Sequence, residues 1–163
     1  MAIVVVFLAV LLVLMYIGWR RRQRRQSGIA RPDAVPESLG VGFGSFDCLY
    51  VATTVAGEPL NRIAVRGLGF RSRGALAVTA TGIVLSLRGQ DDAFIPTAAL
   101  REVTRATWTI DRVVEDGGLV LIAWTLGSGD TAAPVDSYFR LEAGSELLDA
   151  ISNIFPVSTG RKA

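Results

Sequence analysis

The chain opens with an unbroken apolar run. Residues 2–19 hold eighteen positions without a charged side chain. At ~1.5 Å rise per residue, a helix of that length spans roughly 27 Å, close to the ~30 Å hydrocarbon core of a bilayer. Tyr16 and Trp19 lie near one end of the run, where interfacial aromatic residues are common. The run therefore predicts a transmembrane helix over residues 2–19.

An arginine cluster follows this run directly, whereas no basic side chain precedes it. A cleaved signal peptide has a basic N-terminal region and small residues at a cleavage site, so we expect a retained anchor. The positive-inside rule then predicts a single-pass protein of the plasma membrane, with its N-terminus outside and residues 20–163 in the cytoplasm. The residues expected to contact the anionic inner leaflet are Arg20, Arg21, Arg22, Arg24 and Arg25.

Residues 20–44 are predicted to form a basic juxtamembrane segment and a flexible linker. Positions 26–44 contain two prolines, four glycines and no long apolar period. The spacing Gly40-x-Gly42-x-Gly44 is superficially similar to a nucleotide-binding loop. No Gly-Lys-Ser/Thr follows, and no strand–loop–helix pattern surrounds it, so a plain connection is expected.

Beyond the linker, apolar and polar residues alternate with a period of two, which is typical of antiparallel strands with one buried face. Turn signals rich in glycine and aspartate interrupt the alternation at 56–59, 89–92, 115–118 and 127–130. The predicted strands lie near 46–54, 60–66, 75–81, 83–88, 93–96, 101–114, 118–126 and 134–142.

The alternation also assigns side chains to the two faces of the sheet. Residues 119–124 are apolar at every position, which predicts a central strand covered on both sides. The residues expected to point inward are Ile83, Leu85, Leu87, Ala106, Trp108, Ile110, Val135, Phe139 and Leu141. Those expected to point outward are Val84, Ser86, Arg88, Arg105, Thr107, Thr109, Asp136, Tyr138 and Arg140.

One amphipathic helix is predicted at the end of the domain. Ser145 suits the N-cap and Pro156 stops the helix. A single apolar stripe is formed by Leu147, Leu148, Ile151, Ile154 and Phe155. Such a helix must close an open end or cover one face of the sheet. We therefore expect a folded domain over 45–156, followed by a tail over 157–163.

Many antiparallel strands followed by one C-terminal helix resemble a pleckstrin-homology-like (PH-like) domain. The most specific feature is an IP-x-x-x-(L/I)-x-x-V segment, formed by Ile95, Pro96, Leu100 and Val103. As a whole, the chain resembles actinobacterial single-pass membrane proteins with a bacterial PH-like domain, often labelled as transporter or export proteins. The resemblance implies a split barrel of about seven antiparallel strands, one C-terminal amphipathic helix and a membrane anchor. It implies no catalytic residue.

The composition excludes several kinds of chemistry. The chain has no histidine and a single cysteine, Cys48. This excludes an intrachain disulfide, His-activated nucleophiles and His-containing metal sites. Cys48 is predicted to be a small buried hydrophobe.

The charge is unevenly distributed along the chain. Positions 20–40 carry six arginines against two acidic residues, whereas positions 41–160 carry nine arginines against thirteen acidic residues. A nucleic-acid-binding domain carries its positive charge on the folded surface, so no nucleic acid partner is expected.

The connection after the second predicted strand carries two candidate sites. The run Gly67-Leu68-Gly69-Phe70, after Arg66, is similar to the carboxylate-binding loop of PDZ domains. No helix is expected between 70 and 142, which a PDZ domain requires, so a glycine-rich connection is the favoured interpretation. A possible lipid or partner loop is formed by Arg66, Arg71 and Arg73. The favoured role is a basic loop facing the anionic membrane, and specific head-group binding is the alternative.

Two pairs of adjacent acidic residues, Asp91-Asp92 and Glu115-Asp116, are assigned to turns. Calcium loops need ligands at alternating positions, which adjacent carboxylates do not supply. We expect no catalytic residue, metal or cofactor, because a nucleophile with its base, a metal cluster or a cofactor loop is absent from the sequence.

These features predict a non-enzymatic, membrane-anchored cytoplasmic module that binds a protein partner. The contact is expected at a sheet edge or in the groove beside the C-terminal helix. One alternative is an accessory subunit of a membrane complex or transport system, with residues 2–19 packed against other helices. The other is a domain that binds anionic-lipid head groups.

Overall fold

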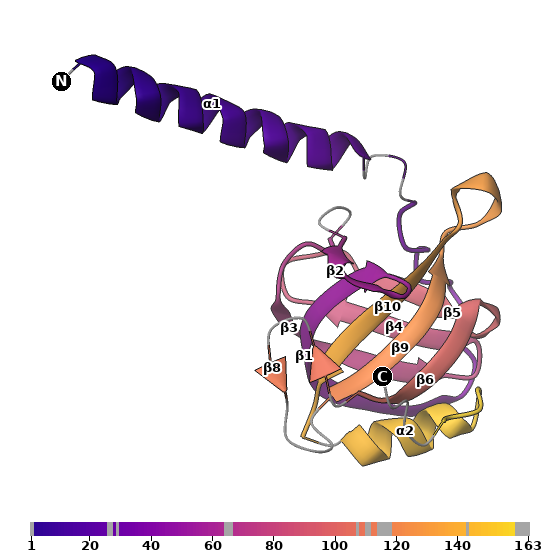
Figure 1. Ribbon diagram of the computed structural model, residues 1–163. Coiled ribbons are helices and arrows are strands. Elements are labelled where there is room, and N and C mark those ends of the chain that lie inside the picture. The colour runs from indigo at the N-terminus through magenta and orange to yellow at the C-terminus, as the bar shows by residue number, and fades with distance from the viewer. Residues whose placement is uncertain are drawn as a thin grey trace.

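A computed structural model describes residues 2–25, 28, 30–63, 67–106, 108–109, 112–113, 119–142 and 144–158. It consists of an N-terminal helix, a curled antiparallel sheet and a C-terminal helix (Figure 1). The antiparallel sheet and the C-terminal helix confirm the mainly-β domain of the predicted fold class.

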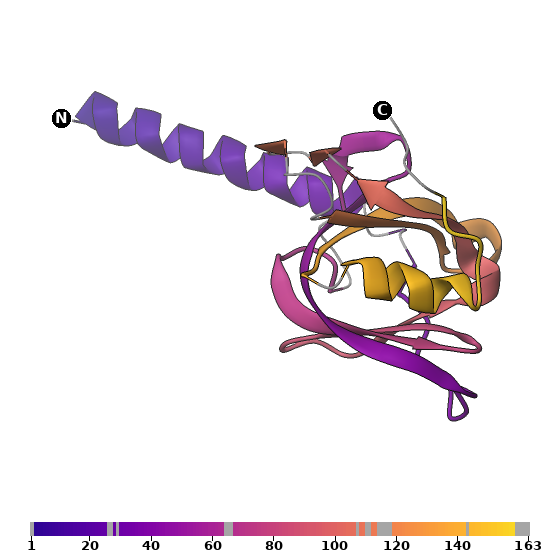
Figure 2. The same cartoon turned by 90° about the horizontal axis from the view of Figure 1, so that it is seen from below.

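The N-terminal helix α1 spans Ala2–Arg25, so it continues six residues beyond the predicted end and includes the arginine cluster. Figures 1 and 2 show it projecting away from the sheet. Its large apolar side chains from Val4 to Ile17 are 42–68% exposed. Among the residues that the structure describes, no helix combines the length and the sustained hydropathy of a membrane span.

One eight-stranded sheet has the order β5-β4-β3-β1-β10-β9-β6, with β2 paired to β1, and all its pairings are antiparallel. Its strands are β1 (Gly42–Val55), β2 (Glu58–Arg62), β3 (Ser72–Thr79), β4 (Gly82–Leu87), β5 (Ala93–Pro96), β6 (Leu100–Ala106), β9 (Leu119–Leu126) and β10 (Ala133–Arg140). A short 3₁₀ helix, η2 (Gly129–Thr131), lies between β9 and β10.

Strand β1 joins the two halves of this sheet. Its N-terminal part, from Gly42 to Tyr50, pairs with β3, and its C-terminal part, from Leu49 to Val55, pairs with β10. The register shifts between Tyr50 and Ala52, which is the signature of a bulge, and a bulge bends a strand. The sheet therefore curls around one core that contains residues of β1, β3, β4, β5, β6, β9, β10 and the C-terminal helix.

The IP-x-x-x-L-x-x-V segment forms the corner between the two ends of the sheet. Ile95 lies near the end of β5, and Pro96 (φ −59°, ψ 145°) precedes the 3₁₀ helix η1 (Thr97–Ala99), which leads into β6. η1 contacts both β4 and β9, so it bridges strands from opposite halves. Ile95, Leu100 and Val103 are buried in the core. The motif therefore has a structural role.

The two end strands of the sheet order, β5 and β6, are each paired with a segment that flanks the domain. On β5, the Phe94 N–H donates to the Asp33 carbonyl at 2.9 Å. On β6, Ser158 bridges to Thr104, and the Ser158 N–H donates to the Val103 carbonyl at 2.9 Å. An open edge strand is a template for pairing with other chains, and these contacts occupy part of each edge. The segment predicted to be a flexible linker thus contacts the sheet, and β1 begins at Gly42, before the predicted start of the domain at 45.

The C-terminal helix α2 spans Gly144–Ser152 and lies across one opening of the curled sheet, as Figure 2 shows. It begins two residues earlier than an N-cap at Ser145 implies, so Ser145 lies in its first turn and is not the N-cap. Leu147, Leu148 and Ile151 are buried, as the apolar stripe predicts. The rest of the stripe, Ile154 and Phe155, packs on the core just after the helix ends.

The predicted strand 101–114 is wrong. β6 ends at Ala106, and a separate two-stranded sheet is formed by β7 (Trp108–Thr109) and β8 (Arg112–Val113). The side chains predicted at Ala106, Thr107, Trp108, Thr109 and Ile110, and the turn at 115–118, lie outside the described residues.

Two predicted outward-facing residues are instead buried. Val84 is 7% exposed, because Phe94 lies opposite it on β5 and turns its ring toward Gly82, on the same face. Asp136 is also 7% exposed, because the β1–β2 turn lies over it and the Gly57 N–H donates to its Oδ2 at 3.3 Å. The other predictions of burial are confirmed for the inward residues of β4 and β10, for Leu141 and for every residue of 119–124.

Candidate binding site

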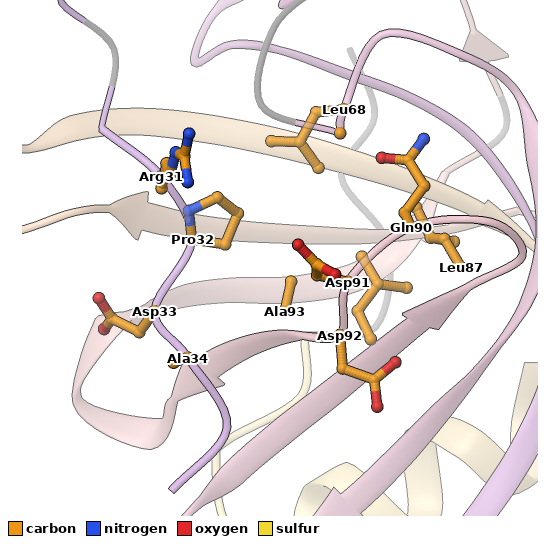
Figure 3. Close-up of a pocket in the computed structure, with 12 residues that line it drawn as sticks. Arg31, Pro32, Asp33, Ala34, Leu68, Leu87, Gln90, Asp91, Asp92 and Ala93 are labelled. Carbon is orange, nitrogen blue, oxygen red and sulfur yellow. The ribbon is translucent and has the colours of Figure 1, made fainter.

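A cavity of about 510 Å³ opens between the chain before β1 and the β4–β5 turn. Figure 3 shows its two walls facing each other, with residues 31–34 on one side and 90–92 on the other. Leu68 lies at one end in Figure 3. The apolar residues Leu85, Leu87 and Ala93 also line the cavity. Ligand-binding cavities in proteins commonly range from about 300 to 1,000 Å³, so this one is large enough to hold a ligand or a partner's side chains.

Backbone contacts hold both walls in place. The Asp33–Phe94 hydrogen bond fixes residues 31–34 alongside β5. On the other wall, the Gln90 N–H donates to the Leu87 carbonyl at 3.1 Å, and Gly89 adopts a φ of 78°. Glycine suits this left-handed conformation, which side chains with a Cβ adopt at a cost. The cavity is therefore formed by ordered backbone on both sides.

The loop at the end of the cavity depends on a second glycine. Gly67 has a φ of 84°, and a Cβ at this position would overlap the Gln90 side-chain oxygen. The close approach of Gly67 to Gln90 joins the β2–β3 connection to the β4–β5 turn. Part of the PDZ-like run therefore serves to bring two loops together.

A buried chain of hydroxyl groups ties the same loop to the core. The Trp124 Nε1–H donates to Ser137 Oγ at 2.9 Å, and Ser137 Oγ lies 2.8 Å from Thr53 Oγ1. The Tyr50 hydroxyl lies 2.8 Å from Thr53 Oγ1 and donates to the Leu68 carbonyl at 2.9 Å. A carbonyl only accepts, and tyrosine has one hydroxyl proton, so Thr53 donates to Tyr50 and Ser137 donates to Thr53. The chain thus runs in one direction, from β9 to the cavity loop.

Burial changes the acid–base properties of two residues near this chain. The pKa of Tyr50 is raised to about 12, chiefly by burial, so its hydroxyl stays neutral and keeps donating to Leu68. The pKa of the Cys48 thiol is also raised to about 12, first by burial and then by the charge of Asp47. Nucleophilic cysteines have a lowered pKa, and Cys48 has the opposite. Its burial confirms the prediction that it is a small hydrophobe.

The cavity is lined by both polar and apolar side chains. In Figure 3 the Asp91 carboxylate points toward the wall around Pro32, whereas the Asp33 and Asp92 carboxylates point away. Arg31 and Gln90 complete the polar groups of the lining. Within the described ranges, no group of three or more His, Cys, Asp or Glu side chains is placed to hold a metal ion. The arrangement suits a ligand that offers hydrogen-bond donors or positive charge to Asp91 and an apolar surface to the leucines.

The arginines predicted to contact a membrane lie partly outside the described residues. Arg20 lies on α1, and its Nη1 donates to the Tyr16 hydroxyl at 3.0 Å. Residues 21, 22, 24 and 25 also belong to α1, but their side chains are not described. Of the predicted loop cluster, Arg66 lies outside the description, whereas Arg71 and Arg73 are exposed. The Arg88 N–H donates to the Arg73 carbonyl at 3.0 Å, so the structure adds exposed Arg88 to this cluster.

The two glycine motifs have structural roles. Gly42 and Gly44 lie in β1, which continues as a strand, so Gly40-x-Gly42-x-Gly44 is no nucleotide-binding loop. The run 67–70 lies between β2 and β3, and the described part of 70–142 contains no α-helix. The sequence analysis missed that Phe70, and Leu60 on β2, are highly exposed. Their apolar character within a turn-rich connection was the available signal.

A model of the family described as Bacterial PH domain-like matches residues 29–154, more than three quarters of the chain. The chain belongs to this family. The match confirms the PH-like domain that the sequence predicted, and it includes residues 31–34 of the cavity wall. The PH-like domain thus begins before β1. No curated protein matches the chain.

Proposed function

We propose that this protein is a non-enzymatic binding module of PH-like fold, held at a membrane by its N-terminal helix. The cavity between residues 31–34 and the β4–β5 turn carries the binding part of this proposal. It combines a suitable volume with a mixed polar and apolar lining, an inward carboxylate on Asp91 and walls that backbone hydrogen bonds hold in place. A short segment of a partner protein that bears a basic side chain fits this chemistry.

The occupied sheet edges support the cavity as the contact. β5 is paired with Asp33 and β6 with Ser158, so a partner strand would have to displace part of the chain at either of these two edges. The remaining edge, on β2, is short and contains Pro59, which cannot donate a backbone hydrogen bond to a partner strand. The cavity needs no such displacement. It therefore replaces the sheet edge as our expected site of partner contact.

The apolar surface of α1 supports the membrane part of the proposal. Thirteen large side chains between Val4 and Ile17 are exposed. Apolar surface of this extent is stable only where it is covered, and a helix that is apolar on all sides suits lipid. The arginines that follow suit an anionic leaflet, and we propose that the domain faces the cytoplasm.

Photo-crosslinking from the cavity in native membranes tests the binding site. We expect a photoreactive residue in place of exposed Ala34 to give one defined cross-linked partner. The control places the same group at Asp130, an exposed residue of η2. Equal yields of the same product from both positions would contradict the cavity as the site.

A conservative substitution tests the chemistry of the cavity. Hydrogen bonds to charged groups contribute about 1.5–3 kcal/mol, so Asp91→Asn should weaken partner binding by roughly ten- to a hundredfold. Asp130→Asn makes the same change on a turn away from the cavity and should leave binding unchanged. Unchanged binding by Asp91→Asn would exclude Asp91 as a contact.

A further inference from the structure

The connection between β1 and β3 exposes two large apolar side chains. Leu60 is 79% exposed and Phe70 is 77% exposed, more than any other large apolar residue described in the PH-like domain. The same connection also contains Ile63 and Leu68, which are buried in the core. The described part of this connection therefore buries Ile63 and Leu68 and leaves Leu60 and Phe70 in contact with water.

The exposed pair is held outward by the contacts of its neighbours. β2 pairs with β1 at Val55–Glu58 and Thr54–Arg62 with a register shift between them, so Leu60 lies on a bulge. The Ile63 N–H donates to the Thr53 carbonyl at 2.8 Å, which fixes the chain after that bulge. The Leu68 carbonyl accepts from Tyr50, which fixes the chain just before Phe70. Leu60 and Phe70 thus project from anchored backbone.

Exposed basic side chains follow Phe70 in the chain. Arg71 and Arg73 follow Phe70 and are exposed, and Arg88 is joined to Arg73 through the backbone. The acidic residue nearest to Leu60 in the chain, Glu58, accepts a hydrogen bond from Asn61 at 2.8 Å. Apolar side chains next to guanidinium groups match the layers of an anionic bilayer surface, with acyl chains below the phosphates.

Strand β2, which carries Leu60, lies at the end of the domain from which α1 leads away (Figure 1). Figure 1 shows β2 at this end, near the last turn of α1, and α2 at the opposite end. A domain connected to a membrane helix through this end would turn β2 and its connection toward the lipid. The position and the charge of the surface therefore favour lipid over another protein as its partner.

We propose that Leu60, Phe70, Arg71 and Arg73 form a second contact with an anionic bilayer, which docks the PH-like domain on the membrane surface. This contact rests on the membrane attachment proposed above and orients the domain relative to the lipid. Leu60 and Phe70 enter the boundary between head groups and acyl chains. Arg71 and Arg73 bind lipid phosphates, to which guanidinium groups donate paired hydrogen bonds.

Labels on the full-length chain in lipid vesicles test this contact. Single cysteines replace Leu60, Phe70 or Val41 in a Cys48→Ala background, and each carries an environment-sensitive dye. Val41 is 68% exposed and apolar but lies before β1, so it controls for non-specific adsorption. The vesicles contain phosphatidylcholine with or without phosphatidylglycerol, and spin-labelled lipids quench dyes that enter the bilayer. Circular dichroism confirms that each variant is folded.

We expect the dyes at 60 and 70 to be quenched in vesicles with phosphatidylglycerol, and the dye at 41 to stay unquenched. Replacing both Arg71 and Arg73 by glutamine should lower the ratio of docked to undocked domain by roughly thirtyfold, since each basic residue contributes ~1 kcal/mol at an anionic surface. Absence of quenching at 60 and 70 in chains that float with the vesicles would overturn the second contact alone. Chains that fail to float would contradict the membrane attachment itself. Equal quenching at all three positions, or quenching unaffected by the arginine changes, would also overturn the proposed surface.

Discussion

Removing the Ser137 hydroxyl should destabilise the domain, because this hydroxyl accepts the hydrogen bond of the Trp124 indole N–H. Ser137 Oγ accepts from Trp124 Nε1 at 2.9 Å, and the two residues are 1% and 2% exposed. Ser137→Ala leaves this N–H without an acceptor in the core. An unsatisfied buried polar group costs about 1–3 kcal/mol, and the loss of the Thr53 contact adds to that cost. We therefore expect a loss of about 2–3 kcal/mol in the free energy of unfolding.

A double-mutant cycle isolates the contribution of the indole N–H. In a Trp124→Phe background this donor no longer exists, so Ser137→Ala should cost about 1–2 kcal/mol less than it does in the native chain. Ser128→Ala is a matched control, because Ser128 is exposed in the β9–β10 turn and should change stability by less than about 0.5 kcal/mol.

Urea unfolding of the full chain in a mild detergent, followed by near-ultraviolet circular dichroism, measures these differences. The urea concentration at the midpoint of unfolding should decrease. The slope of the free energy of unfolding against urea concentration should stay the same, as expected when a substitution changes only the stability of the native state. A cost for Ser137→Ala equal to that of Ser128→Ala would refute the buried hydroxyl chain. If the losses of stability from Trp124→Phe and Ser137→Ala simply added up in the double variant, the Trp124–Ser137 hydrogen bond would be refuted.

Three further predictions concern the buried groups and the cavity loop. Cys48 should resist alkylation at pH 8 in the folded chain and react rapidly in denaturant, since it is buried and its pKa is about 12; equal rates in both states would contradict its burial. In the unfolded chain Tyr50 ionises near the ordinary tyrosine pKa of 10.0, whereas burial in the folded domain raises this pKa to about 12. Its contribution to stability is therefore complete below pH 10 and declines as the pH rises to 12, and Tyr50→Phe should make this alkaline decline shallower in pH-dependent urea unfolding. Gly67→Ala should destabilise the domain by about 1 kcal/mol, because Gly67 has a φ of 84°, which residues with a Cβ adopt at a cost. Gly42→Ala, at a glycine outside the left-handed region with open space around it, should cost less in the same assay, and equal losses would contradict the backbone strain at Gly67.

The strands and the final helix were predictable because their signals are local. A period of two in β4 and β10, and the spacing of Leu147 and Ile151 in α2, each depend on a few neighbouring residues. The exceptions arise where distant segments meet. Phe94 of β5 covers Val84, and the turn at Gly57 covers Asp136. The alternation of apolar and polar residues around Val84 and Asp136 does not predict either contact.

The cavity was not predictable, because it joins three separate parts of the chain. Residues 31–34 had the composition of a linker, 67–68 resembled a motif of another family, and 90–92 had the chemistry of a turn. The hydrogen bond from Phe94 to Asp33 and the close approach of Gly67 to Gln90 bring them together. The hydroxyl chain from Trp124 to Leu68 crosses four segments in the same way. Such contacts depend on sheet order, which a periodic pattern leaves open.

The central claim is that a PH-like binding module is held at a membrane by α1, and extraction of native membranes with alkaline carbonate tests it most directly. The native chain should stay in the membrane pellet. A variant with Leu11→Lys and Leu12→Lys, which places two charges in the middle of the helix at about 2.5–3.5 kcal/mol each, should appear in the supernatant. Release of the native chain by carbonate would contradict the account.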